Sequence, residues 1–223
     1  MGRRFWQNNE GFNLIEVVVA IIITGIIAAG ASIGVSTVFN ARVESAAEVF
    51  GNFMKETRKK AMALDNTEDS SSGESDVFVV FYKKGDNYYA EMYQIAYLYD
   101  YTKKPSESGY KSFKAIEKLG STKKLCNDYV EIVLSNHEGT DTFTVGELNT
   151  ANGLAVFFKH NGAISAIKTC LSNSGDISDG TAVFANYVCP ANGHYADTVN
   201  FNKDTENVTV IIVNETGRCY LDE

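Results

Sequence analysis

A single carboxylate stands at the head of a long uncharged stretch in this 223-residue chain. Glu16 is followed by residues 17–41, none of which carries a charged side chain. On membrane-insertion scales a charge within such a stretch costs about 2.5–3.5 kcal/mol at the bilayer centre, and less near the interface. An ionisable group with that cost is a functional-site hypothesis by default and needs a partner. Glu16 therefore predicts a cation that meets it in an apolar environment.

The stretch after Glu16 is long enough to cross a membrane. As a helix, residues 17–41 would span about 37 Å, which exceeds the hydrocarbon core of about 30 Å. Arg3 and Arg4 precede it, and the positive-inside rule keeps a short basic leader in the cytoplasm. The run is too long for the apolar part of an ordinary secretory signal, and no small-residue cleavage site follows it. A plain single-pass anchor is the alternative, but it does not explain Glu16.

The residues around Glu16 resemble a known signal. The run GFNLIE at 11–16, followed by VVVAIIITGIIAAGA, is similar to the class III signal of type IV prepilins and type II secretion pseudopilins. The resemblance covers roughly residues 1–40 and implies that a prepilin peptidase cuts after Gly11 and methylates the new N-terminal residue, Phe12. Glu16 is then the fifth residue of the mature chain. Its implied partner is the Phe12 amine of a neighbouring subunit. Asn13 departs from the threonine or serine usual in the family, and Ile33 stands where many major pilins have proline.

The same resemblance implies an organisation and a set of partners. Residues 1–11 would be a cytoplasmic leader and residues 12–40 a transmembrane and polymerisation helix. Residues 41–223 would form an extracellular globular domain that includes the amphipathic half of the helix. The expected partners are a prepilin peptidase, other pilin or pseudopilin subunits, and the assembly machinery of the cytoplasmic membrane. The precursor would lie in that membrane with its N-terminus inside, and the mature chain in an extracellular or cell-surface filament, without a cofactor.

The remaining pattern predicts an α+β fold, with one long helix, transmembrane and then amphipathic, packed on an antiparallel sheet. Apolar residues recur every three or four positions from Phe39 to Leu64, as on one face of a helix. A polar break at 65–76 follows, and a period of two then predicts a hairpin from Val77–Tyr82 and Tyr88–Tyr99. A short helix is expected at 113–119. Further strands are expected at Tyr129–Leu134, Phe143–Val145, Leu154–Lys159, Ala163–Thr169, Val183–Val188 and Val208–Val213.

A second resemblance lies toward the C-terminal end. GLAVFFKHNGAIS at 153–165 and NVTVIIVNETGRCY at 207–220 are similar to segments of H-type minor pseudopilins, which implies a minor subunit. Some relatives with G-R-x-R in the last turn bind DNA, but the run Gly217-Arg218-Cys219-Tyr220 lacks the second arginine. Arg218 is therefore expected to be a weak DNA contact at most. The net charge of −8 also argues against non-specific nucleic-acid binding.

Four cysteines follow the apolar stretch, and none lies in a C-x-x-C pair that would indicate a zinc ribbon: Cys126, Cys170, Cys189 and Cys219. In an exported domain an even number favours disulfides, with three possible connectivities. Of these, we expect Cys170 to pair with Cys189 and Cys126 with Cys219. Four reduced, buried thiols are the alternative.

No arrangement of residues indicates catalysis, so an enzymatic function is not expected. The chain has no phosphate-binding loop and no H-E-x-x-H helix. Asn173, Asp176 and Asp179 lack the spacing of a calcium loop, and no metal site is expected. Two functions stay open: a structural subunit of a pilus or secretion pseudopilus, or a membrane-anchored adhesin or DNA-uptake module that does not polymerise.

Overall fold

The computed structural model describes residues 14–64, 74–99, 102–104, 106–109, 111–135, 142–150, 152–179, 181–186, 196–204 and 206–222. The side chains of Leu14, Glu16, Asn186, Ala196 and residues 26–41, 74–76, 97–99 and 111–114 are not part of this description. The chain divides into two compact units, Met1–Ala41 and Arg42–Glu223. The core and the sheets belong to the second unit.

The helix α1 runs from Leu14 to Ala63. Its sequence contains no proline, since the two prolines of the chain are Pro105 and Pro190, so each backbone N–H after the first turn can donate within the helix. In the second unit one face of α1 is buried and the opposite face is charged and exposed. The buried positions are Val43, Ala46, Ala47, Phe50, Phe53, Met54, Thr57 and Ala61.

The first sheet has six strands in the order β3-β2-β1-β6-β7-β8, and each neighbouring pair is antiparallel. The strands are β1 (Glu74–Lys84), β2 (Asn87–Tyr99), β3 (Lys111–Asn127), β6 (Gly153–Lys159), β7 (Ile164–Leu171) and β8 (Val183–Asn186). Two short 3-10 helices accompany them, η1 (Leu148–Thr150) and η2 (Ile177–Asp179).

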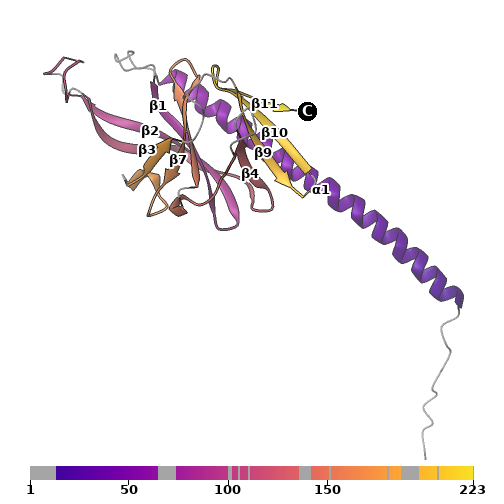
Figure 1. Cartoon of the computed structure of the whole chain (residues 1–223). Coiled ribbons are helices and arrows are strands. Elements are labelled where there is room, and N and C mark those ends of the chain that lie inside the picture. The colour runs from indigo at the N-terminus through magenta and orange to yellow at the C-terminus, as the bar shows by residue number, and fades with distance from the viewer. Residues whose placement is uncertain are drawn as a thin grey trace, which may run out of the picture. The chain divides into compact units, whose positions relative to one another are not determined.

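The second sheet has five strands in the order β11-β10-β9-β4-β5, again antiparallel throughout. They are β4 (Glu131–Ser135), β5 (Thr142–Thr144), β9 (Ala196–Lys203), β10 (Glu206–Val213) and β11 (Arg218–Asp222). Figure 1 shows β9, β10 and β11 beside α1. The edge strand β11 and Val210 of β10 line a groove together with α1.

The main core lies between the buried face of α1 and the two sheets. Phe50 of α1 packs on Phe81 of β1, with ring centroids 4.5 Å apart, and on Phe201 of β9, at 5.5 Å. One helix side chain therefore contacts both sheets. The fold is α+β with antiparallel sheets, as the sequence predicts.

The first sheet is buried on its other face as well. Phe78 stacks on Phe157 and Tyr93 there, with centroids 4.6 Å and 5.6 Å apart, and Ile177 of η2 and Leu148 of η1 belong to the same cluster. Burial on both faces explains why the sequences VFVVFY of β1 and GLAVFF of β6 are nearly continuous apolar runs instead of alternating ones.

Two predictions about secondary structure are wrong. Residues 113–119, expected as a short helix, lie in β3, where pairing with β2 holds them extended. A single sheet was expected, but two are present, because β9 and β11 add to the predicted strand at 208–213. Both missed strands are short of apolar residues on one side: β9 alternates buried Val199 and Phe201 with polar Thr198, Asn200 and Asn202.

Candidate functional site

The N-terminal residues that carry the predicted signal lie mostly outside the described part of the chain. This holds for Gly11 and Phe12, and for the side chain of Glu16, whose backbone lies in the first turn of α1. The described side chains that follow are exposed on every side of the helix. Ile15, Val17 and Ile21, for example, are 65%, 42% and 67% exposed. The described side chains of this part of α1 therefore present an exposed apolar surface.

Among the residues whose side chains are described, no helix combines the length and apolarity that a membrane crossing requires. The predicted span at 12–40 falls largely outside those residues, since the side chains of residues 26–41 are not described.

In the second unit, Arg58 joins α1 to the turns of both sheets. Its Nε donates a hydrogen bond of 2.7 Å to the backbone oxygen of Thr216, in the β10–β11 turn. The same side chain lies against Gly162, in the β6–β7 turn, where an added Cβ would come within 2.8 Å of Nε. Gly162 in turn touches Gly217, because a Cβ built on Gly217 would collide with the Gly162 carbonyl oxygen. We call Arg58, Gly162, Thr216 and Gly217 the Arg58 corner.

The Arg58 corner brings together the two segments that carry the minor-pseudopilin resemblance. A backbone hydrogen bond of 2.8 Å from Ile164 to Asn214 adds a second link between them. Gly162 and Gly217 both have positive φ, 83° and 62°, a region that side chains with a Cβ rarely adopt. The glycines of the two similar segments thus have a packing role in this fold.

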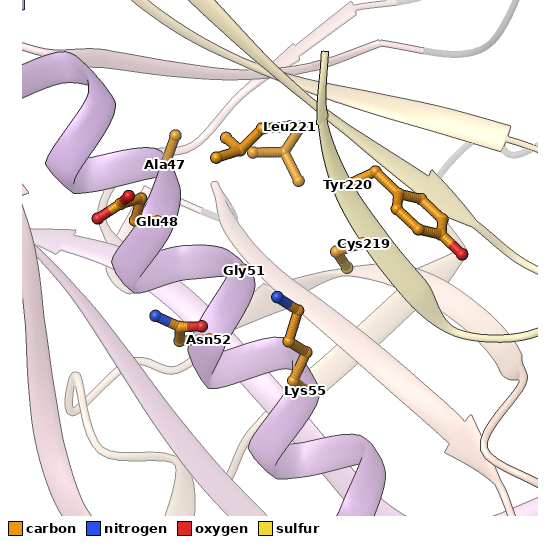
Figure 2. A pocket seen from close by; sticks show the side chains of 9 residues that line it. Ala47, Glu48, Gly51, Asn52, Lys55, Cys219, Tyr220 and Leu221 are labelled. Atoms are coloured by element: carbon orange, nitrogen blue, oxygen red, sulfur yellow. The ribbon is translucent and has the colours of Figure 1, made fainter. Parts of the chain in front are cut away.

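The exposed ridge of α1 has a groove on each flank. The first, of about 410 Å³, lies between α1 and the β10–β11 hairpin; it is lined by Ala47, Glu48, Gly51, Asn52, Lys55, Val210, Cys219, Tyr220 and Leu221. Figure 2 shows Glu48 and Lys55 on the helix side and Leu221 and Cys219 across from them. The second, of about 300 Å³, lies between α1, β2 and β3, and Asn52 and Glu56 contribute to it.

A buried carboxylate lies on the far face of the first sheet. Glu91 of β2 is 7% exposed and accepts hydrogen bonds from Lys118 Nζ at 2.5 Å, from Thr122 Oγ1 at 2.6 Å and from the Tyr93 hydroxyl. Thr122 reaches it because β3 carries extra residues opposite Glu91, where the register shifts between Ala90 and Met92. We call Glu91, Tyr93, Lys118 and Thr122 the Glu91 cluster.

The hydrogen-bond partners of Glu91 favour its ionised form. Burial alone would raise its pKa, but the hydrogen bonds from Lys118, Thr122 and Tyr93 hold the pKa below its usual value. Burial raises the pKa of Tyr93, and its hydrogen bond to Glu91 raises it further. The cluster is a hydrogen-bonded ion pair in a buried sheet, and a glutamate within a strand is its only trace in the sequence.

The predicted pairing of Cys126 with Cys219 is wrong for this structure. Cys126, Cys170 and Cys219 all have free thiols, and burial raises the pKa of each to about 12. Cys126 is on β3 and Cys219 on β11, in different sheets, while Cys170 is buried in the cluster on the far face of the first sheet. Cys189 and its predicted pairing with Cys170 lie outside the described residues.

Two further sequence candidates have a structural position. Arg218 is exposed at the start of β11, and its backbone N–H donates to Thr216 Oγ1 at 3.4 Å. In the loop after β7, Asp176 accepts from the backbone N–H and the hydroxyl of Ser178, and Asp179 likewise from Thr181. In the part of the chain that is described, no three metal-binding side chains come together.

The comparisons with known proteins concern the N-terminus. Residues 6–32 match the family model of the prokaryotic N-terminal methylation motif. The match contains Gly11, Phe12 and Glu16 and overlaps the first part of α1. The chain therefore carries the signal of type IV pilin-like precursors at the place where the sequence resemblance puts it. No curated protein and no solved structure is significantly similar to the chain.

Proposed function

We propose that the chain is a structural subunit, without catalytic activity, of a type IV pilus or a type II secretion pseudopilus. The observation that carries the proposal is the methylation motif at residues 6–32, directly ahead of and within a 50-residue helix. In this proposal a prepilin peptidase cuts after Gly11 and methylates Phe12. The subunit then assembles with other pilin or pseudopilin subunits through the helix.

The apolar start of α1 supports a membrane-held precursor. The described apolar side chains from Ile15 to Ile23 are exposed, and exposed apolar area of this kind is unfavourable in water. In the proposal, residues 12–40 lie in the cytoplasmic membrane with the N-terminus inside. They later pack against the same segments of other subunits in an extracellular or cell-surface filament.

Glu16 has a defined task in this proposal. Cleavage creates a positive amine at Phe12, and a carboxylate placed in an apolar setting is stabilised by an opposite charge nearby. Glu16 of one subunit neutralises the Phe12 amine of its neighbour, so the pair leaves the membrane without an isolated charge. Assembly machinery of the cytoplasmic membrane would supply the energy for that transfer.

A minor subunit, present in few copies, is the subtype that the C-terminal segments support. Residues 153–165 and 207–220 resemble H-type minor pseudopilins, and the fold places them in contact at the Arg58 corner. A shared local packing arrangement would account for a shared sequence pattern.

Intact-mass and N-terminal analysis of the full chain, expressed in cells with a prepilin peptidase, tests processing. We expect a mature chain that starts at Phe12 with one added methyl group. Gly11→Val should leave an unprocessed precursor, because a side chain at the cleavage position obstructs the peptidase, while Gly2→Val in the same leader should be processed normally. An untrimmed wild-type chain would contradict the proposal and favour a membrane-anchored adhesin or DNA-uptake module.

A second experiment separates processing from assembly. Glu16→Ala should be trimmed like the wild type but should enter filaments poorly, since it lacks the charge for the Phe12 amine. Filaments sheared from cells and quantified by immunoblot give the incorporated fraction. Equal incorporation of the wild type and the alanine variant would rule out the pairing role.

A further inference from the structure

The exposed side of α1 carries two pairs of charges of opposite sign. Glu44 and Glu48 lie one turn apart, and Lys55 and Lys59 lie one turn apart further along. All four side chains are exposed. Residues four apart share a face of a helix, and these four positions fall on one face. We call Glu44, Glu48, Lys55 and Lys59 the charged face.

The charged face is unfavourable for an isolated chain. Like charges four residues apart repel each other on a helix, and both pairs have this spacing. Within the described residues none of the four side chains forms an ion pair. The helix macrodipole favours lysines toward the C-terminal end of α1, but it does not explain Glu44 and Glu48, since its effect is confined to the terminal turns.

Each lysine of the charged face follows one of the glutamates by the same number of residues. Lys55 follows Glu44, and Lys59 follows Glu48, by eleven positions each. Eleven residues are close to three helical turns, about 10.8 residues, and correspond to about 16.5 Å along the axis. If a second, parallel copy of α1 is displaced by this distance, both of its glutamates face both lysines of the first copy at once.

The surroundings leave this face accessible. The grooves on the two flanks of α1 hold about 410 Å³ and 300 Å³, so the helix stands as a ridge between them. Glu48 and Lys55 lie at the rim of the first groove (Figure 2). Side chains of a neighbouring helix can therefore enter beside the charged face without displacing either sheet.

We propose that the charged face binds the charged face of a second copy of this chain, in parallel orientation and offset by eleven residues. Lys55 and Lys59 of one copy then meet Glu44 and Glu48 of the next. The inference rests on the proposed function, because subunits drawn from one membrane have parallel helices. An antiparallel pair would instead match Glu48 with Lys55 and Glu44 with Lys59.

Charge reversal in the full chain tests the contact, in cells that carry a peptidase and an assembly system. Glu44→Lys with Glu48→Lys, or Lys55→Glu with Lys59→Glu, should lower the fraction of the chain in sheared filaments by at least about five-fold, because attraction becomes repulsion. Glu107→Lys with Glu117→Lys, a matched change at exposed positions elsewhere, should leave that fraction unchanged. Co-expression of the two charge-face variants should restore it, which also shows that both variants fold.

Cysteine cross-linking tests the offset. Oxidation of a Glu48→Cys, Lys59→Cys chain should give covalent dimers, because these positions meet only between displaced parallel copies. A Glu48→Cys, Lys55→Cys chain should stay monomeric, and the wild type gives the background from native cysteines. Dimers from the second chain and none from the first would overturn the parallel offset.

The outcomes separate the inference from the function on which it rests. If the charge variants are trimmed at Phe12 and assemble as well as the wild type, the proposed contact is wrong and the subunit function stands. If the wild type itself is neither trimmed nor assembled, the subunit function fails, and the inference fails with it.

Discussion

Two glycines from different turns touch at the Arg58 corner, and each has a reason to lack a side chain. Gly217 combines a positive φ with no room for a Cβ beside the Gly162 carbonyl. Gly85, in the β1–β2 turn, has a similar φ of 57° but open space around it. A comparison of Gly217 with Gly85 therefore separates the effect of backbone strain from that of a steric collision.

We expect Gly217→Ala to destabilise the second unit by about 2–4 kcal/mol, because strain and collision act together. Gly85→Ala should cost about 1–2 kcal/mol, from the left-handed conformation alone. Urea unfolding of the full chain in detergent, followed by circular dichroism, measures both. Equal losses for the two variants would show that the turns do not touch as described.

The Glu91 cluster links stability to pH. A carboxylate whose pKa is lowered in the fold stabilises it above the unfolded pKa, and that contribution is lost as pH falls through the folded pKa. For glutamate the unfolded value is about 4.3, so the loss occurs below about pH 4.3. We expect Glu91→Gln to cost roughly 1–3 kcal/mol at pH 7, since Lys118 loses its acceptor.

The same variant should lose less stability than the wild type between pH 5 and pH 3, when unfolding is measured across that range. Glu117→Gln on β3, which is exposed, serves as the control and should follow the wild-type curve. If the free energy of unfolding of Glu91→Gln and of the wild type falls by the same amount between pH 5 and pH 3, the Glu91 contacts are not formed in solution.

At the scale of elements, α1 and the hairpins with regular periodicity were predictable from the sequence. Apolar residues every three or four positions predicted the helix, and the turn at Gly85 and Asp86 predicted the pairing of β1 with β2. β3 was missed because its lysines and glycines obscure any period, while its conformation comes from pairing with β2. The long-range contact of Arg58 with Thr216 spans 158 positions and leaves no local pattern.

The signal at the N-terminus and the buried sites were predictable to very different degrees. Gly11, Phe12 and Glu16 stood out because the types and spacing of neighbouring residues define them, and the family match covers them. The Glu91 cluster and the free thiols depend on which face of a strand each residue occupies, and on partners far away in the chain. Local sequence does not carry that information.

Phe50 of α1 packs on Phe81 in the first sheet and on Phe201 in the second, so its loss affects the packing of three elements. We expect Phe50→Ala to lower the free energy of unfolding by about 3–5 kcal/mol, from lost burial and the cavity left behind. Phe50→Leu should cost clearly less, because most of the volume remains. Asn52→Ala, on the exposed side, should stay within about 0.5 kcal/mol in the same urea titration.

At the scale of the whole molecule, the two units differ in how far their described apolar side chains are buried. Among the described side chains, the buried residues of both core clusters begin at Val43 and lie in the second unit, whereas the apolar side chains from Ile15 to Ile23 are exposed. We therefore expect the second unit to fold without residues 1–41.

A chain restricted to residues 42–223 should fold without detergent and remain monomeric at micromolar concentration, with one cooperative thermal transition. The full chain should need detergent or a membrane. Light scattering after gel filtration and circular dichroism melting are the measurements. A truncated chain that melts without cooperativity would show that the second unit draws stability from the missing part.

The order of the strands along the chain also determines when each part of the core is synthesised. A chain leaves the ribosome from its N-terminus at about 5–20 residues per second. The helix face that carries Phe50 therefore exists well before β9, β10 and β11, which form much of its second wall. During that interval the first sheet alone can cover the apolar side chains of this face, so the side that β9 and β10 complete is exposed for a period that a shorter sequence separation would remove. Chaperone dependence should therefore end only when the β10–β11 turn has emerged and reached Arg58.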